Sequence, residues 1–295
     1  MDPRIIALYD EYTHAPLPRR TFLERLAALA GGSAAAMAML PLLENNYAIA
    51  AIVEPADARV ATERVRVKVP SGEMRVYVAT PRTGPAKRGG VIAIHENRGL
   101  NAHLEDIARR LAVAGFTGVA VDMLSPQGGT PADEDKAREM FGKVDPTVAV
   151  ADLVAVVDWL AARPDANAKV GAVGFCWGGG MVNLLATASP KLAAGVPFYG
   201  AAPPSTDVAK IRARMLMHYA GNDPRINAGI PGYETALKAA RVDYRMHTYE
   251  GAEHAFNNDT AGVRYNEAAA KLAWSRTVEF LQSALAGDGR RRPEA

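Results

Sequence analysis

The only cysteine of this 295-residue chain, Cys176, lies in the segment Gly174-Phe175-Cys176-Trp177-Gly178. The pattern Gly-x-nucleophile-x-Gly is typical of a sharp turn that joins a buried strand directly to a helix and exposes the nucleophile at its tip. Glycines suit both flanks because a Cβ there would collide with neighbouring backbone. The helix N-terminus also favours the thiolate over the thiol. Cys176 is therefore a candidate nucleophile, and the alternative is an inert buried cysteine.

Two further polar residues follow later apolar segments, in the chain order that such a nucleophile requires. The motif GNDPRIN contains Asp223, and the motif GAEHAFNN contains His254. An imidazole can take or share the thiol proton, and a carboxylate can hold the imidazole in one tautomer. Asp122 also follows an apolar segment, but it precedes the cysteine, and its alternative role is to cap the loop MLSPQGG. We therefore expect a triad of Cys176, Asp223 and His254.

Four other histidines receive no catalytic role. His218 and His247 lie within predicted strands, where a core or surface role is expected. His14 and His103 are expected to be solvated.

The elements that must position these residues alternate along the chain from residue 64 onward. Two segments with alternating polar and apolar residues flank PSGE and predict an antiparallel hairpin. Short apolar runs then predict strands at 90–95, 117–121, 169–175, 194–199, 214–220 and 242–249. Helical periodicity lies between them, at 102–114, 132–142, 147–163, 178–188, 231–240 and 263–285. This alternation predicts an α/β protein with a mainly parallel sheet of about eight strands and helices on both faces.

Composition narrows the classes of function. The chain has 34 basic and 32 acidic residues and a net charge of +2, so nucleic-acid binding is not expected. One cysteine cannot form an internal disulfide, and no Cys/His cluster has metal-ligand spacing, so neither a metal nor a cofactor is expected.

The first 55 residues differ from the rest of the chain. Arg19 and Arg20 precede a mildly apolar run at 26–43, which resembles a twin-arginine export signal, and AIAA at 48–51 could be its cleavage site. The alternative is an uncleaved, cytoplasmic N-terminal helix that lies on the domain. The run is short for a membrane span, so no stable span is expected. We expect an extension at 1–55, one domain at 56–287 and a flexible tail at 288–295.

Together, GFCWGGG, GNDPRIN and GAEHAFNN resemble the dienelactone hydrolase (carboxymethylenebutenolidase-like) family of α/β-hydrolases. The resemblance runs from about residue 64 to residue 285 and implies the α/β-hydrolase fold with a Cys-Asp-His triad. The segment IHENRGLN resembles the family's loop near the cysteine. By that resemblance Glu96 would hold the resting thiol, and the main-chain N–H groups of Asn97 and Trp177 would form the oxyanion hole. The alternative for Glu96 is a surface salt bridge with Arg98.

The chain departs from the family where lactone-cleaving members carry two arginines that hold a substrate carboxylate. Those positions are Pro126 and Asn258 here, which makes dienelactone itself a doubtful substrate. Arg98 could replace one arginine, so Arg98 and Asn258 are candidate substrate-binding residues. We expect hydrolysis of a small-molecule ester or lactone with a good leaving group, through a thioester on Cys176. The alternative is a catalytically silent binding protein that keeps the same fold.

Overall fold

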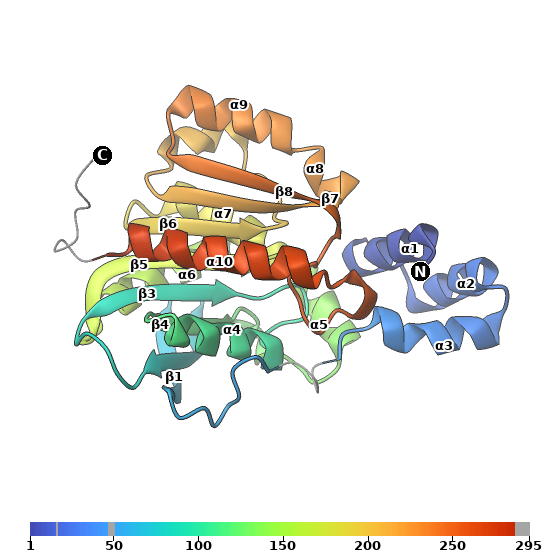
Figure 1. The fold of residues 1–295 in the computed structure, drawn as a ribbon, viewed down its shortest axis with the longest axis horizontal. Coiled ribbons are helices and arrows are strands. Elements are labelled where there is room, and N and C mark those ends of the chain that lie inside the picture. The colour runs from blue at the N-terminus through green and yellow to red at the C-terminus, as the bar shows by residue number, and fades with distance from the viewer. Residues whose placement is uncertain (16, 47–50, 287–295) are drawn as a thin grey trace.

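The chain folds around one eight-stranded sheet (Figure 1). The structure is a computed structural model and describes residues 1–15, 17–46 and 51–286. In chain order the strands are β1 (Val60–Val69), β2 (Gly72–Pro81), β3 (Arg88–Ile94), β4 (Thr117–Asp122), β5 (Ala166–Phe175), β6 (Leu192–Phe198), β7 (Arg214–Asn222) and β8 (Tyr244–Glu253). Across the sheet they follow the order β1-β2-β4-β3-β5-β6-β7-β8.

The sheet is mixed, with its antiparallel part at one edge. Strand β2 runs antiparallel to both β1 and β4, whereas β3 to β8 all run parallel. Every residue of β4 is buried, as expected for a strand covered on both faces, while β1 at the edge has several exposed residues. The predicted hairpin and the predicted mainly parallel sheet are confirmed.

Helices cover both faces, as predicted. On one face α4 (Ala102–Val113) and α10 (Glu267–Ala284) share an apolar core with the sheet. On the other face lie α6 (Pro146–Ala161), α7 (Trp177–Ala188) and α9 (Ile230–Ala240). Two shorter helices, α5 (Glu134–Phe141) and α8 (Pro224–Asn227), follow β4 and β7 near the carboxyl ends of the strands. Helix α10 begins four residues later than expected because 262–264 forms a separate 3-10 turn.

The N-terminal segment folds as three helices beside the carboxyl ends of the strands (Figure 1). These are α1 (Pro3–His14), α2 (Arg19–Ala30) and α3 (Ser33–Leu43), and they bury an apolar cluster of their own. Within this cluster the Tyr12 and Phe22 rings stack with centroids 4.3 Å apart. The guanidinium of Arg264 lies over the Tyr9 ring, at 4.9 Å from its centroid, and so joins the cluster to the rest of the molecule.

Among the described residues, no single helix is long and apolar enough to cross a membrane, and α2 and α3, which would suffice only together, are bent by 109°. Most of the predicted cleavage motif, residues 48–50, lies outside the described residues, as does the predicted tail at 288–295.

Candidate active site

Cys176 lies at the turn between β5 and α7, in a backbone conformation that its neighbours impose. Its φ is +54°, a value that side-chain-bearing residues rarely adopt, and its N–H donates to the Phe198 carbonyl at 3.0 Å. A Cβ on Gly174 would lie 2.2 Å from the Gly178 carbonyl oxygen, and a Cβ on Gly178 would lie 2.4 Å from the Ile94 carbonyl oxygen. The glycine requirement deduced from the motif is therefore confirmed. The turn places the Cys176 sulfur at the carboxyl end of the sheet.

Asp223 and His254 meet although they follow different strands. Asp223 comes directly after β7, and His254 directly after β8, which is the parallel neighbour of β7. The Asp223 Oδ2 atom lies 2.5 Å from His254 Nδ1, and both side chains are buried. The opposite ring nitrogen, Nε2, is also buried and has no hydrogen-bond partner among the described residues. A ring nitrogen of His254 comes within 4.8 Å of the Cys176 sulfur.

Asp122, the competing acid, has a different task in the structure. Its carboxylate accepts from the backbone N–H groups of Leu124 and Thr130, at 3.1 Å each, and from the Thr130 hydroxyl at 2.8 Å. These bonds tie together the loop after β4. The capping role that the sequence offered as the alternative for Asp122 is confirmed, which leaves Asp223 as the carboxylate beside His254.

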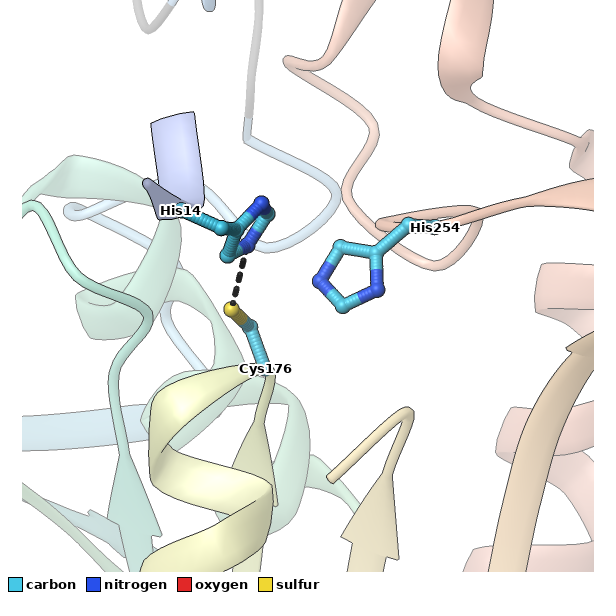
Figure 2. Close-up of side chains that lie close together, drawn as sticks. All are labelled: His14, Cys176 and His254. Carbon is cyan, nitrogen blue, oxygen red and sulfur yellow. Dashed lines mark hydrogen bonds between the residues drawn. The ribbon is translucent and has the colours of Figure 1, made fainter. Parts of the chain in front are cut away.

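The sulfur has a second histidine neighbour, His14, which the sequence analysis placed in solvent (Figure 2). His14 Nε2 lies 3.2 Å from Cys176 Sγ, and the His14 side chain is only 13% exposed. Its ring packs edge-on against His254, with centroids 4.6 Å apart. The expectation for His14 was wrong because the packing of α1 against the loop after β3 and against α5 cannot be read from the local sequence. The available signal was Asp10, one helical turn before His14 on an amphipathic segment.

His103 was also expected in solvent and is buried instead. Its Nδ1 lies 2.8 Å from Asp259 Oδ1, its ring packs edge-on against Phe175, and it does not line the pocket described below. The Asp259 carboxylate is thus the acidic neighbour of this buried ring.

The Cys176 sulfur and the imidazoles of His14 and His254 favour the charged forms, a thiolate beside imidazolium groups. Burial disfavours the Cys176 thiolate, but the charges of His14 and His254 outweigh burial and lower the pKa of Cys176 to about 6. Burial likewise opposes the charged form of His254, but the thiolate and the Asp223 hydrogen bond raise its pKa to about 10. The pKa of His14 is raised as well, because the thiolate and Asp10 outweigh its burial. A thiolate flanked by imidazolium groups is the result.

Glu96 is held by two neighbours at the edge of the site. The Tyr199 hydroxyl donates to its Oε1 at 3.3 Å, and the Asn258 amide donates to its Oε2 at 3.1 Å. The sulfur of Cys176 instead has its hydrogen bond with His14. The expected contact between Glu96 and the resting thiol is therefore not the one formed, because both carboxylate oxygens are engaged elsewhere.

The two candidate substrate-binding residues need correction. Arg98 is 6% exposed, and its guanidinium lies 3.8 Å from the Glu134 carboxylate and 3.6 Å from that of Asp135. Its charge is balanced by acidic residues of α5 rather than offered to a substrate. Asn258 is 1% exposed, and its amide oxygen accepts from Thr260 while its amide nitrogen holds Glu96. Neither residue is free to bind a substrate carboxylate.

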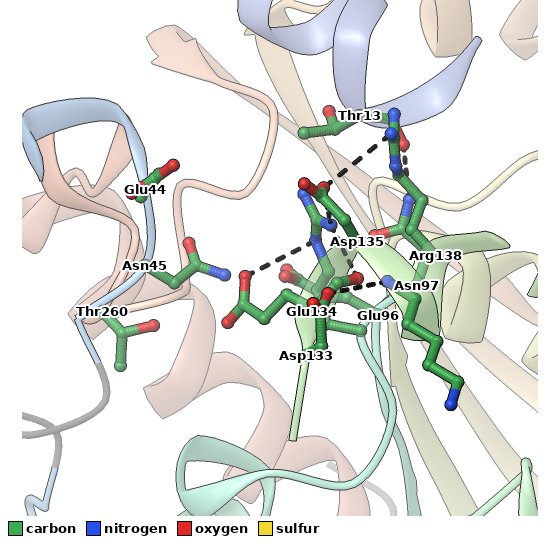
Figure 3. A network of polar contacts seen from close by, with 12 residues as sticks. Thr13, Glu44, Asn45, Glu96, Asn97, Asp133, Glu134, Asp135, Arg138 and Thr260 are labelled. Atoms are coloured by element: carbon green, nitrogen blue, oxygen red, sulfur yellow. Dashed lines mark hydrogen bonds and ion pairs between the residues drawn. The ribbon is translucent and has the colours of Figure 1, made fainter. Parts of the chain in front are cut away.

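A pocket of about 860 Å³ opens beside the sulfur. Residues from two parts of the chain line it. Leu17 and Pro18 come from the segment after α1, whereas Phe141, Trp177, Met181 and Leu184 come from the main domain. Asn97 and Trp177, the predicted oxyanion-hole residues, both line the pocket together with Cys176. The Asn97 side chain donates to the Thr13 carbonyl at 2.7 Å, so α1 also fixes this loop (Figure 3).

The same three residues have atoms of the types that zinc accepts. One ligand atom each from His14, Cys176 and His254 lies within 4.8 Å of the others. Each histidine also has a carboxylate beside its Nδ1, Asp10 for His14 and Asp223 for His254. A cysteine nucleophile activated by histidine needs the same arrangement, however. The strained strand-to-helix turn at Cys176 is typical of such a nucleophile and not of a zinc ligand.

Comparisons with known proteins place these residues in a family. Residues 74–285 match the model described as "Dienelactone hydrolase family". The "Putative carboxymethylenebutenolidase" of Saccharolobus solfataricus is 32% identical over 247 residues, which cover 71% of this chain and 94% of that protein. The "Putative hydrolase fragment YghX" of Escherichia coli is 44% identical over 114 residues, which cover 38% of this chain and 97% of the fragment. A solved "Putative Dienelactone Hydrolase" from Klebsiella pneumoniae has a TM-score of 0.67 at 27% identity, over 75% of this chain and 97% of that one.

Proposed function

The chain belongs to the dienelactone hydrolase family and is an ester or lactone hydrolase, and from that premise we propose that it works through a thioester on Cys176. The observation that carries the proposal is the convergence of Cys176, His254 and Asp223 at three strand ends. A thiolate at a strand-to-helix turn, with an imidazole held by a carboxylate beside it, is an arrangement that attacks carbonyl carbon.

Acylation begins from the thiolate. Its electron pair forms the bond from sulfur to the carbonyl carbon, and the carbonyl π pair moves onto oxygen. The main-chain N–H groups of Asn97 and Trp177 stabilise that oxyanion. When the bond to the leaving oxygen breaks, His254 gives its proton to that oxygen, and Cys176 retains the acyl group as a thioester.

Deacylation returns the proton. Neutral His254 accepts a proton from a water molecule that attacks the thioester carbon, and Asp223 stabilises the imidazolium that forms. The tetrahedral intermediate then expels the Cys176 thiolate and the carboxylic acid leaves. Because a thiolate is itself a good leaving group, the first intermediate can revert, so productive substrates need an alcohol that departs easily, such as an enol or a phenol.

The pocket favours a neutral substrate with an apolar part. Arg138, Lys143 and Arg225 line it, but each already has an acidic partner. Arg138 lies 3.8 Å from Asp135, Lys143 lies 2.8 Å from Glu139, and Arg225 lies 3.4 Å from Asp10. With Pro126 and Asn258 at the two family arginine positions, every arginine or lysine among the described residues that line the pocket already has an acidic partner.

The test compares wild type with Cys176→Ala on p-nitrophenyl acetate and on a series of longer acyl chains. The substitution removes the covalent step and little buried volume, so we expect turnover to fall to the uncatalysed rate while the circular dichroism spectrum is retained. Activity within about tenfold of wild type would remove Cys176 from the mechanism. Mass spectrometry of the acylated enzyme after a stopped reaction supplies the direct observation, since Cys176 is the only cysteine.

A further inference from the structure

The first helix of the chain places a histidine against the nucleophile. His14 is the last residue of α1, and its Nε2 lies 3.2 Å from the Cys176 sulfur, across 162 residues of sequence (Figure 2). The three-residue site derived from the motifs does not use this contact. An imidazole nitrogen this close to a buried thiol can exchange a proton with it.

Asp10 fixes which ring nitrogen of His14 faces the sulfur. The Asp10 carboxylate lies 3.0 Å from His14 Nδ1, and the Asp10 backbone carbonyl lies 2.8 Å from the same nitrogen. The Thr13 hydroxyl also lies 3.0 Å from Nδ1, but it donates its proton to the Asp10 carbonyl. Nδ1 therefore faces acceptors and carries the proton, and Nε2 is left to exchange a proton with the thiol. Asp223 orients His254 in the same way. Two carboxylate-imidazole pairs therefore converge on one sulfur.

The position of His14 is fixed by bonds to the residues just before it. The Thr13 carbonyl accepts from the Asn97 side chain at 2.7 Å. The Tyr12 hydroxyl donates to Asp135 at 2.7 Å, and the Arg138 guanidinium lies over the Tyr12 ring at 4.2 Å from its centroid. Because these contacts join α1 to the predicted oxyanion loop and to α5, His14 is held at the sulfur by packed structure rather than by a loose end of the chain.

We propose that His14, positioned by Asp10, is a further catalytic residue, which takes the proton of the Cys176 thiol and holds the thiolate in the resting enzyme. The proposal rests on Cys176 being the nucleophile, as proposed above. In this step the S–H bond breaks and an N–H bond forms at His14 Nε2, with no other reactant. His254 then serves the leaving group and the water, which fits its buried Nε2 without a partner among the described residues.

If His14 is catalytic, the N-terminal segment is part of the active site. Cleavage near residue 50 would remove His14 together with Asp10, so the active enzyme must retain α1. The segment that resembles an export signal would then be part of the catalytic machinery. We accordingly expect the intact mass of the active protein to include residues 1–14.

Several charged or titratable groups near the sulfur must be considered in any pH experiment. From the elements packed around it, these groups are His14 and Asp10 of α1, Glu96 of the loop after β3, Tyr199 after β6, Asp223 after β7, Arg225 of α8 and His254 after β8. Of these, His14 and His254 lower the pKa of Cys176, whereas the Cys176 charge adds to burial and to Glu96 in raising the pKa of Tyr199. A variant of His14 alone should therefore move the thiol titration without removing the triad.

The experiment measures the rate of alkylation of the single cysteine by iodoacetamide, from about pH 5 to about pH 10, in wild type, His14→Gln, His14→Ala and Glu11→Gln. Glu11 is the matched control because it lies on α1 but pairs with Arg25 and is 44% exposed. A chelator in every sample prevents adventitious zinc from protecting the thiol. We expect half-maximal alkylation near pH 6 for wild type and Glu11→Gln, in line with the pKa of Cys176. Both His14 variants should shift upward by at least about one pH unit, which makes alkylation at pH 6 roughly fivefold slower or more.

Chemical rescue supplies a second readout that a purely structural role of His14 would not produce. His14 lines the large pocket, so free imidazole can reach the space vacated in His14→Ala and should restore part of kcat/KM there, but not change Glu11→Gln. If a His14 variant unfolds, Asp10→Asn carries the test, with a smaller shift in the same direction. His14 variants that alkylate like wild type would overturn the proposal while leaving Cys176 in place, whereas an active Cys176→Ala would instead overturn the proposed function.

Discussion

The Asp223 carboxylate and the His254 imidazole meet at 2.5 Å between Oδ2 and Nδ1, although 31 residues separate them in the chain. The contact exists because β7 and β8 are parallel neighbours, so the residues that follow them emerge at the same edge of the sheet. Asp223 also caps the first turn of α8 by accepting from the Ile226 N–H at 3.2 Å, which orients its carboxylate toward the ring.

Replacing the Asp223 carboxylate should lower kcat/KM, whereas replacing the Asp122 carboxylate should lower stability. Asp223→Asn keeps the shape but lets the imidazole adopt the wrong tautomer, so we expect kcat/KM to fall by about two to four orders of magnitude. Asp122→Asn is the matched control, since it removes an equally buried charge from a loop away from His254. Asp122→Asn should cost stability and leave most of the activity per folded molecule. If it were the more damaging change in folded protein, the acid would be Asp122.

The ion pair at the sulfur predicts a bell-shaped pH dependence of kcat/KM. The rate should rise as pH passes about 6, because the Cys176 pKa is lowered to about 6 and the thiolate is the reacting form. It should fall as pH passes about 10, because the His254 pKa is raised to about 10 and above it the leaving oxygen receives no proton. The two apparent values belong to the coupled cluster rather than to single residues.

The leaving group offers a check on the assignment of the upper limb. A p-nitrophenolate departs without a proton, whereas a phenolate of an unsubstituted phenyl ester benefits from one. The fall above about pH 10 should therefore be shallower for the p-nitrophenyl ester, after subtraction of the Cys176→Ala blank. Identical upper limbs for both esters would mean that His254 does not protonate the leaving group.

The turn around Cys176 should tolerate a methyl group at one glycine and not at another. Gly178→Ala would place a Cβ 2.4 Å from the Ile94 carbonyl oxygen, and we expect a loss of about 1 to 3 kcal/mol in the free energy of unfolding. Gly180→Ala, in the same helix, has its closest contact at 3.6 Å and should be neutral or stabilising by up to about 1 kcal/mol. Urea denaturation of the two variants measures the difference. Equal stabilities would contradict the close approach of α7 to β3.

The sheet and the three motif residues could be predicted because local sequence determines them. Apolar runs of strand length bounded by helical periodicity specify a parallel sheet, and parallel strands place their following residues at one edge. Each of the three motif residues comes directly after a strand, namely Cys176, Asp223 and His254. Their closeness could therefore be predicted from the positions of the strands in the sequence. The collision that a Cβ would cause at Gly174 and Gly178 also followed from the motif.

The environment of the sulfur could not be predicted, because it depends on how segments far apart in sequence pack. His14 reaches Cys176 only after Tyr9, Tyr12 and Phe22 have packed into one apolar cluster. Arg98 was read as a substrate ligand because its partners Glu134 and Asp135 lie in α5 and are not adjacent in sequence. For both His14 and Arg98 the residue type did not predict burial, because the sequence around a polar residue can be the same at a surface position and at a buried one.

The N-terminal segment should also set the length of the acyl chain that the enzyme accepts. Leu17 lines the pocket from the segment after α1, together with side chains that the main domain contributes. Leu17→Trp adds bulk at this wall and leaves Cys176, His14 and His254 unchanged. We therefore expect kcat/KM for p-nitrophenyl acetate to stay within about threefold of wild type, while octanoate esters lose about tenfold or more through a raised KM.

The control for this change is Met37→Trp, which adds the same indole to α3 at a side chain that is 59% exposed and away from the pocket. Its ratio of long-chain to acetate activity should match that of wild type. A Leu17→Trp variant with an unchanged ratio would show that the acyl chain does not extend toward α1, and that the wall formed by Met181 and Leu184 of α7 holds it instead. Leu184→Trp would then become the variant that shortens the preferred chain.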